Sequence, residues 1–304
     1  MGVLSGSIGA RLSSGPPLLL DAAMGTELQR RDADTKLPLW SASALIRDPE
    51  LVWTIHSDEV SAGAEILTAN TFRTHARSLA KAGLAERSGE LGALAVQLAH
   101  QAAAAPGRDI FVAGSLSPLE DCYRPDLVPD DAALAREHGA QARFLADAGV
   151  DLILAETHNT IREAAAALRA AKATGIPVFV SLVTDGKGSL LSGESIADAA
   201  KALLQLGPDA LGINCVPAAR LAGDLAVLAA AAPGVPLLAY GNLGLPDDSR
   251  GWAFTEELSP EEYAETARGW IERGARIVGG CCGTTPAHSR ALRQAIDLGG
   301  RQGS

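Results

Sequence analysis

Residues 150–173 read VDLILAETHNTIREAAAALRAAKA, and this stretch contains the unit from which the fold is predicted. Residues 150–155 form a short apolar run that is continuous instead of alternating, which is typical of a strand covered on both faces of a parallel sheet. Residues 161–173 then follow a helical pattern. The stretch therefore predicts one buried strand followed by one helix.

The same unit recurs along the chain. Short apolar runs that predict strands lie at 17–20, 64–69, 110–114, 150–155, 177–183, 210–214, 235–240 and 275–279, and helical patterns lie at 49–62, 76–104, 131–148, 161–173, 195–206, 218–231, 260–273 and 286–296. Eight strand–helix units in about 280 residues match a single α/β domain of the (β/α)8 TIM-barrel type. We assign it residues 16–298, with a flexible N-terminal tail at 1–15 and a C-terminal tail at 299–304.

An open, doubly wound sheet is the main alternative to the barrel. That fold often carries a glycine-rich phosphate loop after its first strand. Here the first strand runs into DAAMGT at 21–26, which has no GxGxxG pattern. The absence of this pattern favours the closed barrel.

Composition excludes several classes of function. The 304 residues are 47% hydrophobic and carry a formal net charge of −10, whereas nucleic-acid-binding proteins usually present a basic face. No apolar run approaches the roughly 20 residues of a membrane helix. The first 15 residues lack the apolar core of a secretory signal, so we expect a cytoplasmic protein. The sequence indicates nothing about the oligomeric state.

Polar residues follow the predicted strands at the end where barrel enzymes carry their chemistry. These residues are Asp21, Asn70, Thr71, Ser115, Glu156, Thr184, Asp185, Cys215, Asn242, Cys281 and Cys282. Three of them are cysteines on one predicted rim, and three thiolates with an open fourth position suit zinc. By spacing alone, buried cysteines that act as small hydrophobes explain them equally well, because no CxxC or HxxxH pair is present.

Longer motifs connect these residues to a known family. The segment GGCCGTTPAH at 279–288, with GINC at 212–215, resembles the homocysteine-binding domain family, which includes S-methylmethionine, betaine and folate/cobalamin-linked homocysteine methyltransferases. The resemblance runs from about Leu18 to Leu292. It takes in LLLDAAMGTEL, LTANTF, GSLSP, LAETHNTIREA and AYGNLG in the family's order.

The resemblance implies a zinc-dependent methyltransferase that makes methionine. It implies that Cys215, Cys281 and Cys282 bind the zinc ion and that the thiol of homocysteine enters as the fourth ligand. Glu156 and Asp21 match acidic positions that the family uses for the amino group of homocysteine. In addition, Asn242 is expected near the fourth metal position when substrate is absent.

The remaining substrate contacts are expected from residue type. Ser115 and Thr26, or nearby backbone amides, are candidates for the carboxylate of homocysteine. A cationic methyl donor favours aromatic faces, and the candidates are Trp40, Phe72 and Tyr240, with Trp252 as a further conspicuous aromatic.

The identity of the methyl donor is predicted from one segment. LPLWSA at 37–42 resembles the branch that uses S-methylmethionine or S-adenosylmethionine, so a sulfonium donor is favoured and betaine is the alternative. A folate or cobalamin donor is not favoured, because those enzymes add separate domains. The chain departs from the family's pattern at Ala22, where glycine is usual, and at Gly241, where proline is usual.

Two other classes of protein are considered. A non-catalytic barrel would close its zinc site with four protein ligands, whereas only three thiols are predicted to converge. A thiol redox enzyme would form a reversible disulfide and bind no metal. Cys122 is predicted to lie in a loop away from the metal, and His75, His138, His158 and His288 are predicted to be surface or helix residues without a metal role.

Overall fold

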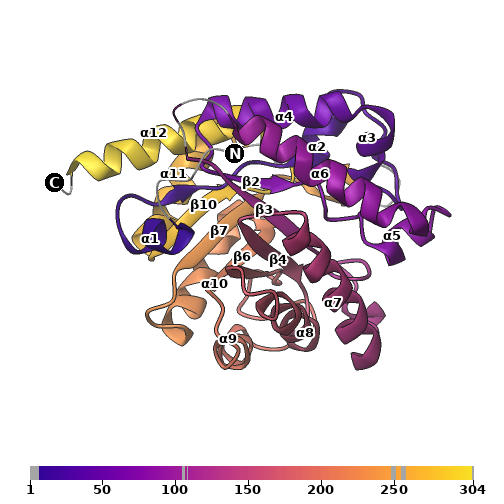
Figure 1. Cartoon of the computed structure of the whole chain (residues 1–304). Coiled ribbons are helices and arrows are strands. Elements are labelled where there is room, and N and C mark those ends of the chain that lie inside the picture. Colours follow the sequence, from indigo (N-terminus) through magenta and orange to yellow (C-terminus); the bar gives the residue numbers. More distant parts are fainter. Residues whose placement is uncertain (1–6, 105–106, 108, 248–250, 255–257, 303–304) are drawn as a thin grey trace.

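The computed structural model describes residues 7–104, 107, 109–247, 251–254 and 258–302. Eight parallel strands form one sheet in the order β1-β10-β7-β6-β5-β4-β3-β2. Their bounds are β1 Leu18–Leu19, β2 Ile66–Ala69, β3 Phe111–Leu116, β4 Leu152–His158, β5 Val178–Leu182, β6 Ala210–Pro217, β7 Leu237–Asn242 and β10 Ala275–Gly280. A parallel bridge between Leu20 and Ile66 joins the two outer strands and closes the ring. The predicted TIM-type barrel is thereby confirmed (Figure 1).

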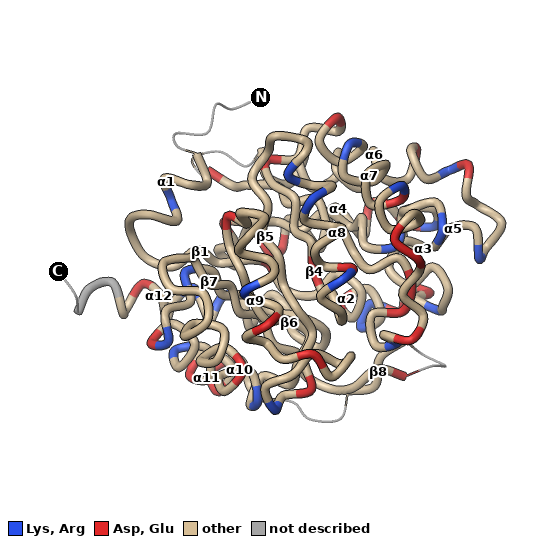
Figure 2. Tube along the Cα trace, turned by 90° about the horizontal axis from the view of Figure 1, so that it is seen from below, with Lys and Arg blue, Asp and Glu red and all other residues tan. Residues whose placement is uncertain are grey.

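Helices surround this barrel (Figure 1). Those of the eight units are α4 Pro49–Ala62, α6 Ser88–Ala103, α7 Asp131–Asp147, α8 Ile161–Lys172, α9 Ile196–Leu204, α10 Ala218–Ala231, α11 Pro260–Glu272 and α12 Pro286–Gln302. Side-chain caps explain several starts: Asp48 accepts a hydrogen bond from the Leu51 amide before α4, and Ser259 forms a capping box with Glu262 before α11. Acidic and basic residues are interspersed along the outer helices in the view of Figure 2.

The core has two layers, as the continuous apolar strands predict. Alternate strand residues such as Phe111 and Ala113, or Leu152 and Leu154, form one buried cluster inside the barrel. The other set, including Val112 and Ile153, packs between the strands and the helices. Because both faces of the strands are covered, only the two ends of the barrel are left to carry polar sites.

Three predicted boundaries differ from the structure. The helix expected over 76–104 is divided into α5 Ala76–Ala80, a 3-10 turn at Ala85–Arg87 and α6, because Gly83 takes a positive φ of 71° that no helix continues. The segment expected as an N-terminal tail contains α1 Ile8–Ser13. Ile8 and Leu12 of α1 are buried in the inner barrel cluster, so apolar packing orders this turn. At the other end, α12 runs past the predicted limit of 298 to Gln302.

Several elements outside the repeated units stand at the carboxyl ends of the strands. The connection from β1 to α4 contains α2 Met24–Arg30 and α3 Ala42–Arg47, and a 3-10 turn at Pro125–Leu127 follows β3. After β7, an antiparallel hairpin pairs β8 Leu245–Asp247 with β9 Gly251–Ala253. Among the described residues, no helix combines the length and the apolar character that crossing a membrane requires.

Candidate active site

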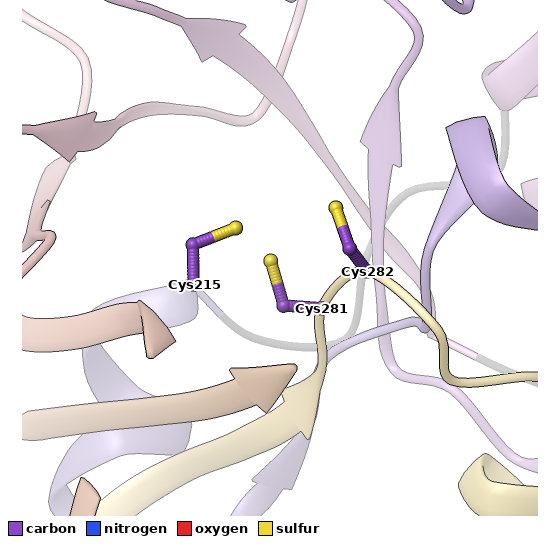
Figure 3. A group of neighbouring side chains, drawn as sticks. All are labelled: Cys215, Cys281 and Cys282. Carbon is purple, nitrogen blue, oxygen red and sulfur yellow. The ribbon is translucent and has the colours of Figure 1, made fainter. Parts of the chain in front are cut away.

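Three thiols converge at the carboxyl end of the barrel. Cys215 lies in β6, whereas Cys281 and Cys282 follow β10 directly, and the three Sγ atoms all lie within 4.8 Å of one another. Figure 3 shows Cys215 on one side and the Cys281–Cys282 turn on the other, with the sulfur atoms directed into the same space. The sequence prediction that these residues share one rim is therefore met by their positions.

The turn that carries Cys281 and Cys282 is fixed by backbone hydrogen bonds to β7. The Cys281 amide donates to the Gly241 carbonyl at 2.9 Å, and the Leu243 amide donates to the Cys282 carbonyl at 2.7 Å. Asn242 lies between these two partners; it is buried, and its Oδ1 has no hydrogen-bond partner among the described residues. An orphaned buried oxygen beside a cysteine turn is costly unless a ligand or metal satisfies it.

The thiol cluster is unfavourable as three free anions. The pKa of Cys215 is raised well above its ordinary value by its hydrogen bond to Cys281, and burial raises it further. The pKa of Cys282 is likewise raised, first by its hydrogen bond to Cys215. Ionisation of all three thiols therefore requires a nearby positive charge, which is what a bound metal ion supplies.

Glu156 lines the same region and is held by two hydroxyl groups. The residue is only 8% exposed, and its two carboxylate oxygens accept hydrogen bonds from Ser115 and, at 3.1 Å, from Tyr240. Tyr240 also contacts Ser181 through its hydroxyl oxygen at 2.6 Å. Burial raises the pKa of Glu156, and the two hydroxyl donors oppose that rise by stabilising the carboxylate. This geometry presents a fixed carboxylate to a cation.

Asp21 forms the second acidic contact. Its carboxylate accepts hydrogen bonds of 2.8 Å from both the amide and the hydroxyl of Thr68 in β2. Burial raises the pKa of Asp21 well above its ordinary range, and the charge of Glu59 adds to the rise. The N-cap of α2 is Ala23, so Asp21 does not cap that helix. A buried ammonium would compensate both Asp21 and Glu156.

One pocket unites these groups. Its lining includes Cys215, Cys281, Cys282, Asp21, Glu156, Ser115, Trp40, Phe72, Tyr240 and Trp252, together with Leu37, Met24, Arg73, Asp121, Cys122, Tyr123 and Asp247. The polar groups of the strand ends and the aromatic residues from the loops thus face a common space. A lining that combines apolar and aromatic side chains with a few charged and polar groups is the usual composition of a small-molecule site.

Trp40 is seated against two glycines. A Cβ atom on Gly25 would lie 2.3 Å from the Trp40 Nε1, and one on Gly251 would lie 1.9 Å from its Cζ3. Gly251 belongs to the β8–β9 hairpin, which also brings Trp252 to the pocket, where the indole Nε1 donates to the Leu243 carbonyl at 2.8 Å. The hairpin therefore fixes the indole of Trp40 against the start of α2.

Two predicted substrate contacts do not line the pocket. Within the described residues, Thr26 and Asn242 do not belong to the pocket lining. The Thr26 hydroxyl is fully buried and accepts a hydrogen bond from the Gly283 amide at 2.9 Å, so it braces the cysteine turn. Ser115 and Tyr240 do line the pocket, but their hydroxyl groups are engaged with Glu156, which places Tyr240 on the carboxylate side instead of a separate donor wall.

The histidines were predicted to be surface or helix residues, and His138 in α7 and His288 in α12 do lie in helices, but none of the four is at the surface. His75, His138, His158 and His288 are all buried, with exposed fractions of 7% or less. His75 caps α5 by accepting a hydrogen bond from the Ser78 amide. No local sequence pattern marked these residues as buried.

Cys122 lies closer to the site than predicted, because it lines the same pocket. It is nevertheless outside the group of thiols that could share one metal ion. Burial raises its pKa to about 12, so its thiol stays protonated at neutral pH.

The pocket residues that were not identified from the sequence include Arg73, Asp121 and Tyr123. They lie in the loops after β2 and β3, one position or more beyond the strand ends on which the prediction concentrated. The signal that could have found them is a charged or aromatic residue in a loop at the active end of a barrel.

Comparisons with known proteins identify the family of this chain. A family model described as homocysteine S-methyltransferase matches residues 18–296. Homocysteine S-methyltransferase of Escherichia coli is 34% identical over 91% of this chain and 94% of its own length, and YbgG of Bacillus subtilis, which bears the same name, is 30% identical over 92% and 95%. The metallated crystal structure of the E. coli methyltransferase MmuM superimposes with a TM-score of 0.81 and 31% identity, covering 94% of this chain and 98% of that one.

A longer protein also matches. Methionine synthase of Mycobacterium tuberculosis is 33% identical over 91% of this chain, which spans about a quarter (24%) of that protein's length.

Proposed function

Because the chain belongs to the homocysteine S-methyltransferase family, we propose that it transfers a methyl group from a sulfonium donor, S-methylmethionine or S-adenosylmethionine, to the thiol of homocysteine in a zinc-dependent reaction that forms methionine. One observation carries the proposal. Cys215, Cys281 and Cys282 converge at one end of a pocket that Asp21 and Glu156 also line. The cysteines can hold a metal ion that binds a thiol, and the two carboxylates can bind an ammonium. The pocket therefore suits a substrate that carries both groups.

The donor set fits zinc. A tetrahedral zinc ion with Zn–S bonds of roughly 2.3 Å separates its sulfur ligands by roughly 3.8 Å, which the observed limit of 4.8 Å accommodates. Three protein ligands leave a fourth position, as in catalytic zinc sites, whereas structural sites are closed by four. When bound, zinc would lower the pKa of the incoming thiol so that it reacts as a thiolate. Asn242, with its unpartnered Oδ1 beside the turn, is proposed to lie near that fourth position.

Asp21 and Glu156 are proposed to bind the ammonium group of homocysteine. Both are buried, and both are fixed by hydrogen bonds that leave their charge uncompensated by a basic side chain among the described residues. The ammonium would offset the desolvation of both carboxylates, and the rigid contacts would orient the substrate sulfur toward the three cysteines. Tyr240 and Ser115 serve this step by orienting Glu156.

The reaction needs no further group from the protein. A carbon–sulfur bond forms between the homocysteine sulfur and the transferred methyl, while the bond from that methyl to the sulfonium sulfur breaks and leaves its electron pair on the departing thioether. The proton of the homocysteine thiol is released to solvent. Positioning of the two reactants in line is then the main contribution of the pocket.

A cationic donor suits the remaining walls. The acidic groups of the lining, Asp21, Glu156, Asp121 and Asp247, favour positive charge, and Trp40 and Phe72 supply aromatic faces. Betaine is also cationic and is the alternative donor. A sulfonium is proposed because LPLWSA at 37–42, which supplies Trp40, resembles the branch that uses it.

The test is to purify the protein, measure zinc per chain and assay homocysteine in parallel with S-methylmethionine, S-adenosylmethionine, betaine and methylcobalamin. The proposal expects one zinc per chain and methionine formed from a sulfonium donor. Methionine formed only from betaine or methylcobalamin would overturn the donor assignment. Bound zinc without methionine from any donor would favour a non-catalytic zinc–thiolate barrel, and a protein without zinc would contradict the proposed metal site.

A further inference from the structure

Among the described residues that line the pocket, Arg73 is the only lysine or arginine. It lies in the loop between β2 and α5, directly after the aromatic Phe72. The other charged residues of the described lining are the acids Asp21, Glu156, Asp121 and Asp247. One guanidinium therefore faces a pocket that otherwise favours cations.

The guanidinium has no ion-pair partner among the residues that the structure describes. Its Nε is buried without a hydrogen bond, and its nearest ring contact is Phe72, with 5.6 Å from the guanidinium carbon to the ring centroid. Arg77, four residues on, shows the usual alternative: it forms two hydrogen bonds of 2.6 and 2.7 Å with Glu137. A half-buried guanidinium with an unsatisfied donor is unfavourable unless an anion accepts a hydrogen bond from it and offsets its charge.

The loop that presents Arg73 is held on both sides. The Ser117 hydroxyl donates to the Phe72 carbonyl at 2.6 Å, and the Ser88 hydroxyl donates to the Thr74 carbonyl at 2.6 Å. The Thr71 hydroxyl reaches the Ser115 carbonyl at 2.9 Å. These contacts fix the backbone around Arg73, so the cost of ordering the residue for a ligand is reduced.

We propose that Arg73 binds the α-carboxylate of an amino-acid substrate in this pocket. The inference rests on the proposed function, in which homocysteine and the sulfonium donor are both α-amino acids. The acidic residues of the pocket can bind the positively charged groups of these substrates. The α-carboxylates of the substrates, however, need a cation or several amide donors. A guanidinium matches a carboxylate through two parallel hydrogen bonds, which also fixes its orientation.

The carboxylate can come from the acceptor or from the donor, and paired analogues distinguish the two. For the acceptor, homocysteine is compared with 3-aminopropane-1-thiol, which lacks only the carboxylate. For the donor, S-methylmethionine is compared with (3-aminopropyl)dimethylsulfonium, which lacks the same group. Each pair is measured on the zinc-loaded wild type and on Arg73→Gln, both by steady-state kinetics and by calorimetric binding.

The expected result is selective. Arg73→Gln should weaken binding, and raise KM, about 10- to 100-fold for one carboxylated substrate, with little change for its analogue. Arg73→Lys should recover part of the loss, because it restores the charge without the planar fork. Loss confined to the homocysteine pair assigns the acceptor carboxylate, and loss confined to the S-methylmethionine pair assigns the donor carboxylate.

Controls separate this role from a structural one. Arg136→Gln, at an exposed position of α7, should leave the binding and KM of both substrate pairs unchanged. The zinc per chain and the thermal midpoint of Arg73→Gln should match those of the wild type. Unchanged binding of both carboxylated substrates, or equal losses for substrate and analogue, would overturn the proposal. Wild-type protein that binds these ligands but forms no methionine would refute the proposed function alone, since the binding comparison still tests Arg73.

Discussion

Asn214 and Thr157 exchange two hydrogen bonds across the barrel. The Asn214 Oδ1 accepts from the Thr157 amide at 3.1 Å, and its Nδ2 donates to the Thr157 hydroxyl at 2.7 Å. Thr157 has a φ of 63°, and Cys215, directly after Asn214, has a φ of 52°. Such left-handed conformations cost about 1–3 kcal/mol each in residues other than glycine, so the fold must hold them in place. The buried pair thus sets the backbone from which the Cys215 thiol projects.

Replacement of Asn214 by alanine should loosen this arrangement. We expect Asn214→Ala to reduce zinc affinity about 10- to 100-fold, as loss of a group that orients a ligand typically does, and to lower the free energy of unfolding by about 1–3 kcal/mol. Competition with a chelator and denaturant unfolding measure the two effects. Asp209→Ala is the matched control, because Asp209 bonds the Val178 amide at the opposite end of β6. Wild-type zinc affinity in Asn214→Ala would refute the positioning role.

Gly25 offers a test of the aromatic wall. A methyl group at this position would overlap the Trp40 indole, so Gly25→Ala should displace the ring from the pocket. We expect KM for the methyl donor to rise several-fold, while zinc per chain and the affinity for homocysteine are kept. Gly89→Ala is the control, since a Cβ atom there, also in the first turn of a helix, meets no other atom within 4 Å. Equal donor KM values in the two variants would contradict the assignment of Trp40 to the donor side.

The repeated apolar runs were sufficient to predict the barrel because each strand is covered on both faces, and burial on both faces leaves a continuous apolar signature. The positions of Cys215, Cys281 and Cys282 at its rim followed from their places just after the predicted strands 210–214 and 275–279. Their role as zinc ligands, and the substrate contacts of Asp21 and Glu156, stay predictions.

The parts that were missed depend on contacts between distant segments. α1 is ordered because Ile8 and Leu12 enter the inner barrel cluster, and a Gly- and Ser-rich stretch carries no local sign of that contact. Glu59 reads as an ordinary helix residue, yet the Ser289 hydroxyl, 230 positions away, bonds its carboxylate at 2.6 Å. Arg73 likewise becomes informative only when the pocket shows its surroundings to be acidic.

Glu59 predicts a dependence of stability on pH. Burial raises its pKa to about 7 in the folded protein, against an ordinary value of 4.5. The folded state therefore binds more protons than the unfolded state between these values, and the contribution of Glu59 to the free energy of unfolding falls as pH rises from about 4.5 through 7. The total change is roughly 3 kcal/mol.

The measurement is urea unfolding of the zinc-free protein at pH 5, 6, 7 and 8. Glu59→Gln should flatten the decline, because the amide does not ionise. Glu50→Gln, at an exposed position of the same helix α4, should leave the wild-type slope unchanged. A decline of the same steepness in Glu59→Gln and the wild type would show that another group is responsible.

Cys122 gives the sharpest test of which thiols bind the metal, because it lines the same pocket as the three clustered cysteines yet lies outside their group. Its thiol is buried and stays neutral, so Cys122→Ala should keep one zinc per chain and activity within a few-fold of the wild type. Cys215→Ala and Cys281→Ala each remove one of three thiolates and should lose both zinc and activity. Zinc per chain, measured by atomic absorption after exhaustive dialysis, separates the two outcomes without relying on turnover. Loss of zinc in Cys122→Ala would make it a fourth ligand and close the position that the thiol of homocysteine requires, whereas full zinc in Cys215→Ala would exclude β6 from the metal site.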